Sequence, residues 1–122
     1  MSDREKEFQA LRQLAVDYRA VVNELKSRHW TEEPEELDFD GLITSTDLKP
    51  PAANGAFIGI NFDFYHATMP DGDNSLRIQL VTKRGDRRMK IFKAEDLARV
   101  GHEDALESVR ATVITYADEI EN

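Results

Sequence analysis

The chain has 122 residues, 40% of them hydrophobic, and a formal net charge of −8 at pH 7. This size suits a single domain with a substantial core, and the hydrophobic content is too high for a disordered acidic chain. The absence of cysteine from the sequence excludes disulfides, a thiolate nucleophile and a cysteine-based zinc site. No apolar run approaches the roughly 20 residues that span a bilayer, and no signal peptide opens the sequence. We therefore expect one domain over residues 1–122, cytoplasmic and without membrane contact.

The first predicted element is a long N-terminal helix. Apolar residues recur from Phe8 to Leu25 at alternating spacings of three and four, the period of an amphipathic helix. Ser2 and Glu5 have the spacing of a capping box, and residues 3–30 contain no Gly or Pro. A helix of about 25 residues would be about 38 Å long. Its stripe can pack on the rest of the domain, or its surplus length can pair with another subunit.

Residues 31–55 are predicted to be mostly loop. Pro34 interrupts an acidic run, and residues 47–55 (DLKPPAANG) are rich in turn formers. Between them, residues 37–44 (LDFDGLIT) alternate weakly and could add a short strand. A loop of this length is uncommon inside a compact domain, so we expect part of it to contact a partner or to stay mobile.

The next residues are predicted to form three antiparallel strands. Residues 56–67 (AFIGINFDFYHA) alternate apolar residues on one face. Residues 75–82 and 87–92 then predict a hairpin, with a two-residue turn inside the sequence KRGD. With that turn, Ile78 and Leu80 face Met89 and Ile91 on the buried side of the sheet.

The C-terminal third is predicted to be helical. Residues 94–100 give a short helix that ends at Gly101, and an apolar stripe from Leu106 to Ile120 marks a last helix. The predicted fold is α+β: a long N-terminal helix, a small antiparallel sheet of three to four strands, and a short helix and a C-terminal helix packed on one sheet face. Because both long helices carry such stripes, we expect a homo-oligomer formed through the N- and C-terminal helices.

The sequence carries no motif that indicates catalysis. His29, His66 and His102 fall in three different regions, without the spacing of a metal-binding helix. Adjacent carboxylates such as Glu32 and Glu33 lie in polar sequence, where nothing would raise a pKa for acid–base work. Glycine-rich phosphate loops and hydrolase signatures do not occur. We therefore expect a binding protein, with no enzyme activity, metal or cofactor.

The most unusual segment is basic. Residues 76–93 hold seven of the 16 Lys and Arg residues and one acid, a local charge of +6 that leaves −14 on the rest of the chain. In the predicted register, the outer face of the sheet interleaves cations with aromatic rings, and Gly59 leaves room for a base. Such a face is typical of single-stranded nucleic-acid binding, where cations contact phosphates and rings stack on bases. The predicted phosphate contacts are Arg77, Lys83, Arg84, Arg87, Arg88 and Lys90, and the predicted stacking residues are Phe57 and Tyr65.

Three other interpretations of this basic segment remain open. Cations on an edge strand deter aggregation. The segment could also dock on an acidic stretch of a sister subunit, such as residues 32–40, or bind an acidic partner protein. In a variant of the last interpretation, the acidic surface of this chain imitates DNA and inhibits a larger protein. The function predicted first is single-stranded nucleic-acid binding, DNA or RNA; the alternative is a protein–protein interaction module, an adaptor or inhibitor.

Overall fold

A computed structural model describes residues 3–38, 40–64 and 74–122. In these residues five strands form one antiparallel sheet in the order β1-β2-β3-β4-β5. The strands are β1 (Thr31–Leu37), β2 (Ile43–Lys49), β3 (Phe57–Asp63), β4 (Ser75–Val81) and β5 (Arg87–Lys93). The predicted α+β class is confirmed, and the sheet is larger than the three to four strands expected.

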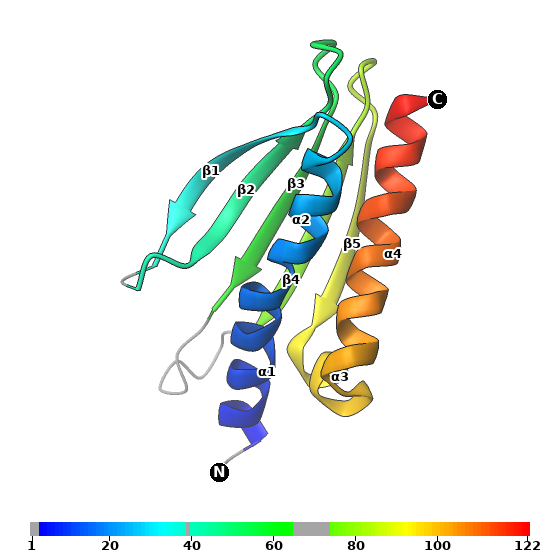
Figure 1. Ribbon diagram of the computed structural model, residues 1–122. Coiled ribbons are helices and arrows are strands. Elements are labelled where there is room, and N and C mark those ends of the chain that lie inside the picture. Colours follow the sequence, from blue (N-terminus) through cyan, green and yellow to red (C-terminus); the bar gives the residue numbers. More distant parts are fainter. Residues whose placement is uncertain (1–2, 39, 65–73) are drawn as a thin grey trace.

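The helices lie on one side of this sheet (Figure 1). They are α1 (Asp3–Asp17), α2 (Arg19–Lys26), α3 (Ala94–Val100) and α4 (His102–Glu121). Helix α2 continues the path of α1, and α4 runs beside them over β3 and β4. None of the described elements covers the other side, which we call the open face. None of the described helices is both long and apolar enough to cross a membrane.

The predicted N-terminal helix is divided at Tyr18. The Val21 N–H donates to the Tyr18 carbonyl at 2.8 Å, which tightens one turn between α1 and α2. The Tyr18 ring is fully buried and lies 5.0 Å from the ring of Phe62 in β3. The other stripe residues that lie fully buried in the same core are Leu11, Leu14, Ala15, Val22 and Leu25. Because this stripe packs on its own sheet, it gives no support to subunit pairing through the helix.

A left-handed residue ends α2 and starts the sheet. His29 has φ +69°, and the Trp30 N–H donates to the Leu25 carbonyl at 3.1 Å, the pattern of a Schellman motif. The chain therefore reverses directly into β1. Trp30 is buried at this corner, and its indole N–H donates to the carboxylate of Glu121 at the end of α4.

The region predicted as a loop forms the β1–β2 hairpin instead. Pro34 disfavours a strand in the sequence because proline lacks an N–H donor. However, β1 is an edge strand, where a proline is tolerated. The pairing with β2 shifts between Pro34 and Glu36, which marks a bulge. The expected loop is thus reduced to short connections on either side of β2.

A partly buried ion pair joins this hairpin to the helices. The Glu32 side chain is only 5% exposed. Its carboxylate accepts hydrogen bonds from Nη1 and Nη2 of Arg19 at 2.6 and 2.5 Å. The Thr46 hydroxyl donates to the same carboxylate at 2.9 Å. Arg19, followed by Thr46, holds the pKa of Glu32 below its ordinary value, although burial opposes this. The network fixes α2 against β1 and β2.

The loop between β4 and β5 is one residue longer than predicted. The Thr82 N–H donates to the Asp86 carbonyl, and the Gly85 N–H donates to the Thr82 carbonyl, both at 2.9 Å. Gly85 takes the positive φ, +88°, that a three-residue hairpin loop of this kind requires. Val81 is consequently paired with Arg87.

This loop places every β5 side chain on the side opposite to the prediction. Ile78 pairs with Lys90 and not with Met89 or Ile91, the neighbours of Lys90 in the sequence. Met89 and Ile91, predicted to be buried, lie on the open face and are 49% and 56% exposed. The predicted face was wrong because a shift of one residue exchanges the two faces of a strand.

Two isoleucines in neighbouring strands test this register. We expect Ile78→Ala to lower the free energy of unfolding by about 3 kcal/mol, because Ile78 is fully buried. Ile91→Ala should lower it by less than about 1 kcal/mol, because Ile91 is exposed. Urea unfolding of dilute protein measures both values. Equally large losses of unfolding free energy in both variants would instead support the register predicted from the sequence, in which Ile91 is buried.

The Glu32 network predicts a pH-dependent stability. At pH 7, Glu32→Gln should lower the free energy of unfolding by about 2 kcal/mol, because Arg19 loses its charge partner. The folded-state pKa of Glu32 lies below its unfolded value, so its contribution is present above the unfolded value and lost as pH falls through the folded one. The difference between wild type and variant should therefore shrink in acid. The control Glu33→Gln, at an exposed pair with Lys49, should stay within about 0.5 kcal/mol of wild type.

Candidate binding surfaces

The predicted nucleic-acid site does not form one surface. Its described members divide among three places: Phe57, Arg77 and Arg87 on the open face, Lys83 and Arg84 in the β4–β5 turn, and Arg88 and Lys90 on the helix side of β5. Tyr65 lies outside the described residues. The prediction that Arg88 and Lys90 share a face with Arg77 was wrong, because the register of β5 is shifted by one residue.

The β4–β5 half of the open face is basic. Arg77 is neutralised by Asp63 on β3, with its Nε 2.7 Å from the carboxylate. Arg87 and Lys93 are exposed and make no ion pair with another described residue. They lie at the two ends of β5, with Met89 and Ile91 between them on the same face. We call Arg77, Arg87 and Lys93, with these two apolar residues, the basic half.

The β1–β2 half of the same face is acidic. It carries Glu33, Glu35 and Asp47, and Lys49 lies 2.7 Å from Glu33. The pKa of Asp47 is raised by its partial burial and then by the neighbouring carboxylate of Glu35. These four residues form the acidic half, and the two halves give the open face opposite charges at its two edges.

Gly59 lies between the halves, on β3. A methyl group at Gly59 would meet Asp47 Oδ1 at 3.5 Å and Phe57 Cε2 at 3.7 Å. The space expected to admit a nucleic-acid base is therefore bounded by a carboxylate as well as by a ring. A carboxylate at that position repels the phosphates of a bound strand.

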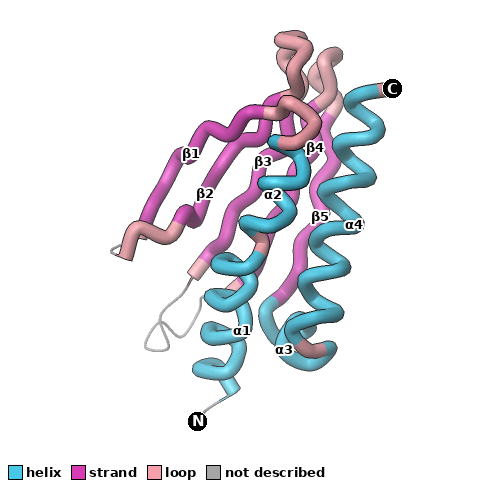
Figure 2. The backbone as a smooth tube through the Cα atoms, in the orientation of Figure 1, coloured by secondary structure: helices cyan, strands magenta, loops and turns pink. Residues whose placement is uncertain are grey.

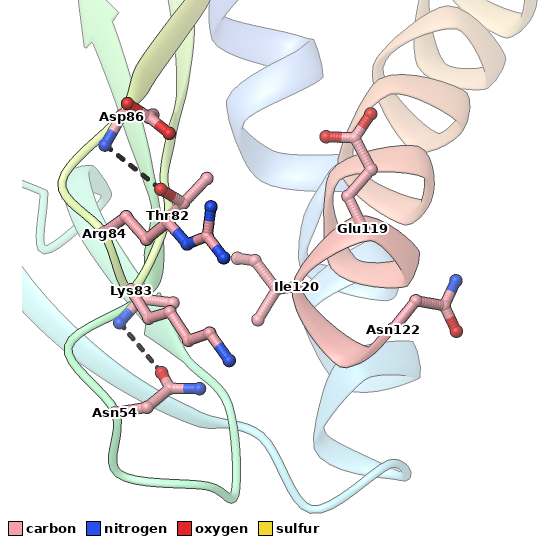
Figure 3. Close-up of a pocket in the computed structure, with 9 residues that line it drawn as sticks. Asn54, Thr82, Lys83, Arg84, Asp86, Glu119, Ile120 and Asn122 are labelled. Carbon is pink, nitrogen blue, oxygen red and sulfur yellow. Dashed lines mark hydrogen bonds between the residues drawn. The ribbon is translucent and has the colours of Figure 1, made fainter.

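The cations of the β4–β5 turn face the end of α4. Lys83 and Arg84, with Asn54 of the β2–β3 loop, line a groove of about 350 Å³ against Ile120 and Glu119. Figure 3 shows both basic side chains extending from the turn toward the helix. The C-terminal end of a helix carries partial negative charge, so these cations have a structural partner there.

A second groove lies between β5 and α4. It measures about 370 Å³ and is lined by Lys90, Ser108, Ala111, Thr112, Thr115 and Tyr116. The helix side of this groove is made mostly of small residues. Sequence reasoning missed them, although their spacing of three and four residues beside the apolar stripe was a visible signal. We call this space the β5–α4 groove.

The cations of the β5–α4 groove lie on aromatic rings. Arg88 pairs with Glu119, and its guanidinium lies 5.9 Å from the centre of the Tyr116 ring. The Lys90 ammonium lies 5.0 Å from the centre of the Phe92 ring. Both contacts are cation–π interactions that hold the charged ends beside the groove.

The two edges of the sheet differ. On β1, the proline and the bulge interrupt the regular row of backbone donors and acceptors. On β5, the described register with β4 is regular over all seven residues, and no proline occurs. Figure 2 shows β5 at the edge of the sheet beside α4. Half of its backbone groups therefore point away from β4.

The two histidines that the structure describes lie at different helices. His29 ends α2, His102 begins α4 with its Nε2 2.6 Å from Asp17, and His66 is outside the described residues. In the part of the chain that the structure describes, no three His, Asp or Glu side chains are arranged to hold a metal ion. Comparisons with protein-family models, curated proteins and solved structures found no match.

The acidic half predicts a shifted titration. The Asp47 carboxyl should titrate above the ordinary range of an aspartate, because burial and Glu35 both disfavour its charged form. Glu35→Gln removes one of these causes and should lower the pKa of Asp47. Carboxyl-carbon NMR titration of wild type and variant measures the change. An unchanged Asp47 titration would show that the two carboxylates do not interact.

Proposed function

We propose that this protein is a protein-interaction module that binds an extended, acidic segment of a partner protein at β5. The observation that carries the proposal is an edge strand of regular register, without proline or bulge, that runs beside a groove. The edge supplies backbone donors and acceptors, and the β5–α4 groove supplies space for side chains. Addition of a peptide strand to a sheet edge is a general mode of recognition, in which main-chain hydrogen bonds give affinity and side-chain pockets give specificity.

The backbone of β5 sets the size of the partner segment. Seven residues of antiparallel strand extend over about 24 Å. A segment of similar length can pair along the whole edge. Such pairing is independent of sequence, because it uses only main-chain groups.

Side chains on the helix side of β5 set the preference for charge. In an added strand, every second side chain faces the same side as Arg88 and Lys90. Acidic side chains there can pair with Lys90 and compete with Glu119 for Arg88, and the small residues of α4 leave room for them. The four cations of β5 attract such a segment to this edge, within a chain that is otherwise acidic.

Single-stranded nucleic-acid binding stays a prediction with less geometric support. Its favourable feature is the half-buried ring of Phe57 on the same face as Arg87. Against it, Arg77 is already paired with Asp63, and Asp47 flanks the position where a base would stack. The cations of the helix side cannot join this face.

A labelled peptide tests the proposal. The probe is a fluorescein-labelled peptide of the length of β5, in which glutamate alternates with alanine. We expect fluorescence anisotropy to rise at tens of micromolar protein, and Arg88→Glu with Lys90→Glu to weaken binding at least tenfold, because like charges then meet. N-methylation of alternate peptide amides should abolish binding, because methylated nitrogens cannot donate to β5.

A matched variant on the same strand serves as the control. Arg87→Glu with Lys93→Glu changes the net charge by the same amount as Arg88→Glu with Lys90→Glu, but on the opposite side of β5. It should therefore weaken peptide binding by less than about threefold. Ala111→Leu fills the groove from an exposed position of α4 and should also weaken binding. Equal losses from both charge pairs, or no rise in anisotropy, would overturn the proposal. If a mixed-sequence oligonucleotide of about 30 nucleotides binds in place of the peptide at about 50 mM salt, the nucleic-acid alternative is favoured.

A further inference from the structure

We propose that the open face binds a second copy of this chain, with the acidic half of each copy on the basic half of the other. This interface uses the side of β5 that the partner segment leaves free. It is therefore independent of binding in the β5–α4 groove. It also differs from the oligomer predicted through the helices, whose apolar stripes pack against the core of the same chain.

The first argument is that the open face is self-complementary in charge. Its acidic half lies on β1 and β2, its basic half lies on β4 and β5, and β3 separates them. Arg87 and Lys93 have no ion-pair partner among the described residues, and Asp47 and Glu35 crowd each other beside Lys49, which is already paired with Glu33. A second copy supplies the missing partner to both groups.

The second argument is geometric. Two sheets stacked face to face can be related by a twofold axis that lies between them and runs parallel to β3. This rotation places β1 and β2 of one copy over β5 and β4 of the other, so opposite charges meet twice. An axis running across the strands would place each half on itself and like charges would meet. Closed twofold dimers of this kind are the commonest protein oligomers.

The third argument concerns apolar surface and area. Met89 and Ile91 are large apolar side chains that the fold leaves about half exposed on this face, and the half-buried Phe57 lies at one end of the central strand β3. The face of the sheet covers roughly 550–600 Å² when treated as flat, from the usual strand spacing and rise. Because side chains project from this plane, the accessible area of the face is larger than the flat area. It approaches the roughly 800 Å² that each partner buries in a standard interface.

Complementary charge reversal tests the dimer. We expect wild type at tens of micromolar to have about twice the 13.9 kDa mass of one chain in sedimentation or light scattering. The variant Arg87→Glu with Lys93→Glu should be monomeric, and so should Glu33→Lys with Glu35→Lys. An equimolar mixture of the two variants should form a heterodimer, because each reversed half then meets a reversed half of opposite charge. High salt should weaken both dimers.

A cross-link locates the axis. The chain lacks cysteine, so Asn61→Cys places a single thiol on the open face of β3, where the axis brings it opposite its own copy. A short bismaleimide should join two such chains, and should not join chains carrying Ser108→Cys on α4. A monomeric wild type would overturn the proposal, and so would variants that stay dimeric or a mixture that stays monomeric. Retained peptide binding by the monomeric variants would show that the groove functions without this dimer.

Discussion

The three-residue loop between β4 and β5 determines which side of the sheet each β5 side chain faces. Because this loop has an odd number of residues, Arg88, Lys90 and Phe92 face the helices, and Arg87, Met89, Ile91 and Lys93 face the open side. One basic strand thus contributes to two surfaces of different character. The helix side meets the small residues of α4, and the open side faces the acidic strands across β3.

Periodicity predicted the elements whose buried face is apolar. The stripes of α1, α2 and α4 and the alternation of β3 and β4 are visible in the sequence because each element covers the same core. β1 was missed because an edge strand with an acidic surface needs no apolar pattern and tolerates Pro34. The face of β5 was mispredicted because Met89 and Ile91 alternate with cations equally well in either orientation, so only the loop length decides between them.

The candidate surfaces could be predicted in composition but not in arrangement. The cluster of cations in residues 76–93 is plain in the sequence, and it lies at one edge of the sheet as a hairpin would place it. Its division between two faces depends on one loop residue. The β5–α4 groove depends on where α4 crosses the sheet, which is set by contacts far apart in sequence, such as Arg110 with Glu24 and Trp30 with Glu121. No local pattern encodes those contacts.

The proline and bulge of β1 also bear on how far an assembly of this protein can grow. A sheet with two open edges can add copies at both ends and extend without limit, as in fibres. In the proposed binding mode β5 accepts a strand, whereas the edge at β1, interrupted at Pro34, is a poor template. Under this proposal each molecule receives one strand at β5, and its β1 edge is a poor site for adding another. Growth by strand addition would then end after a single step, and such complexes would stay finite.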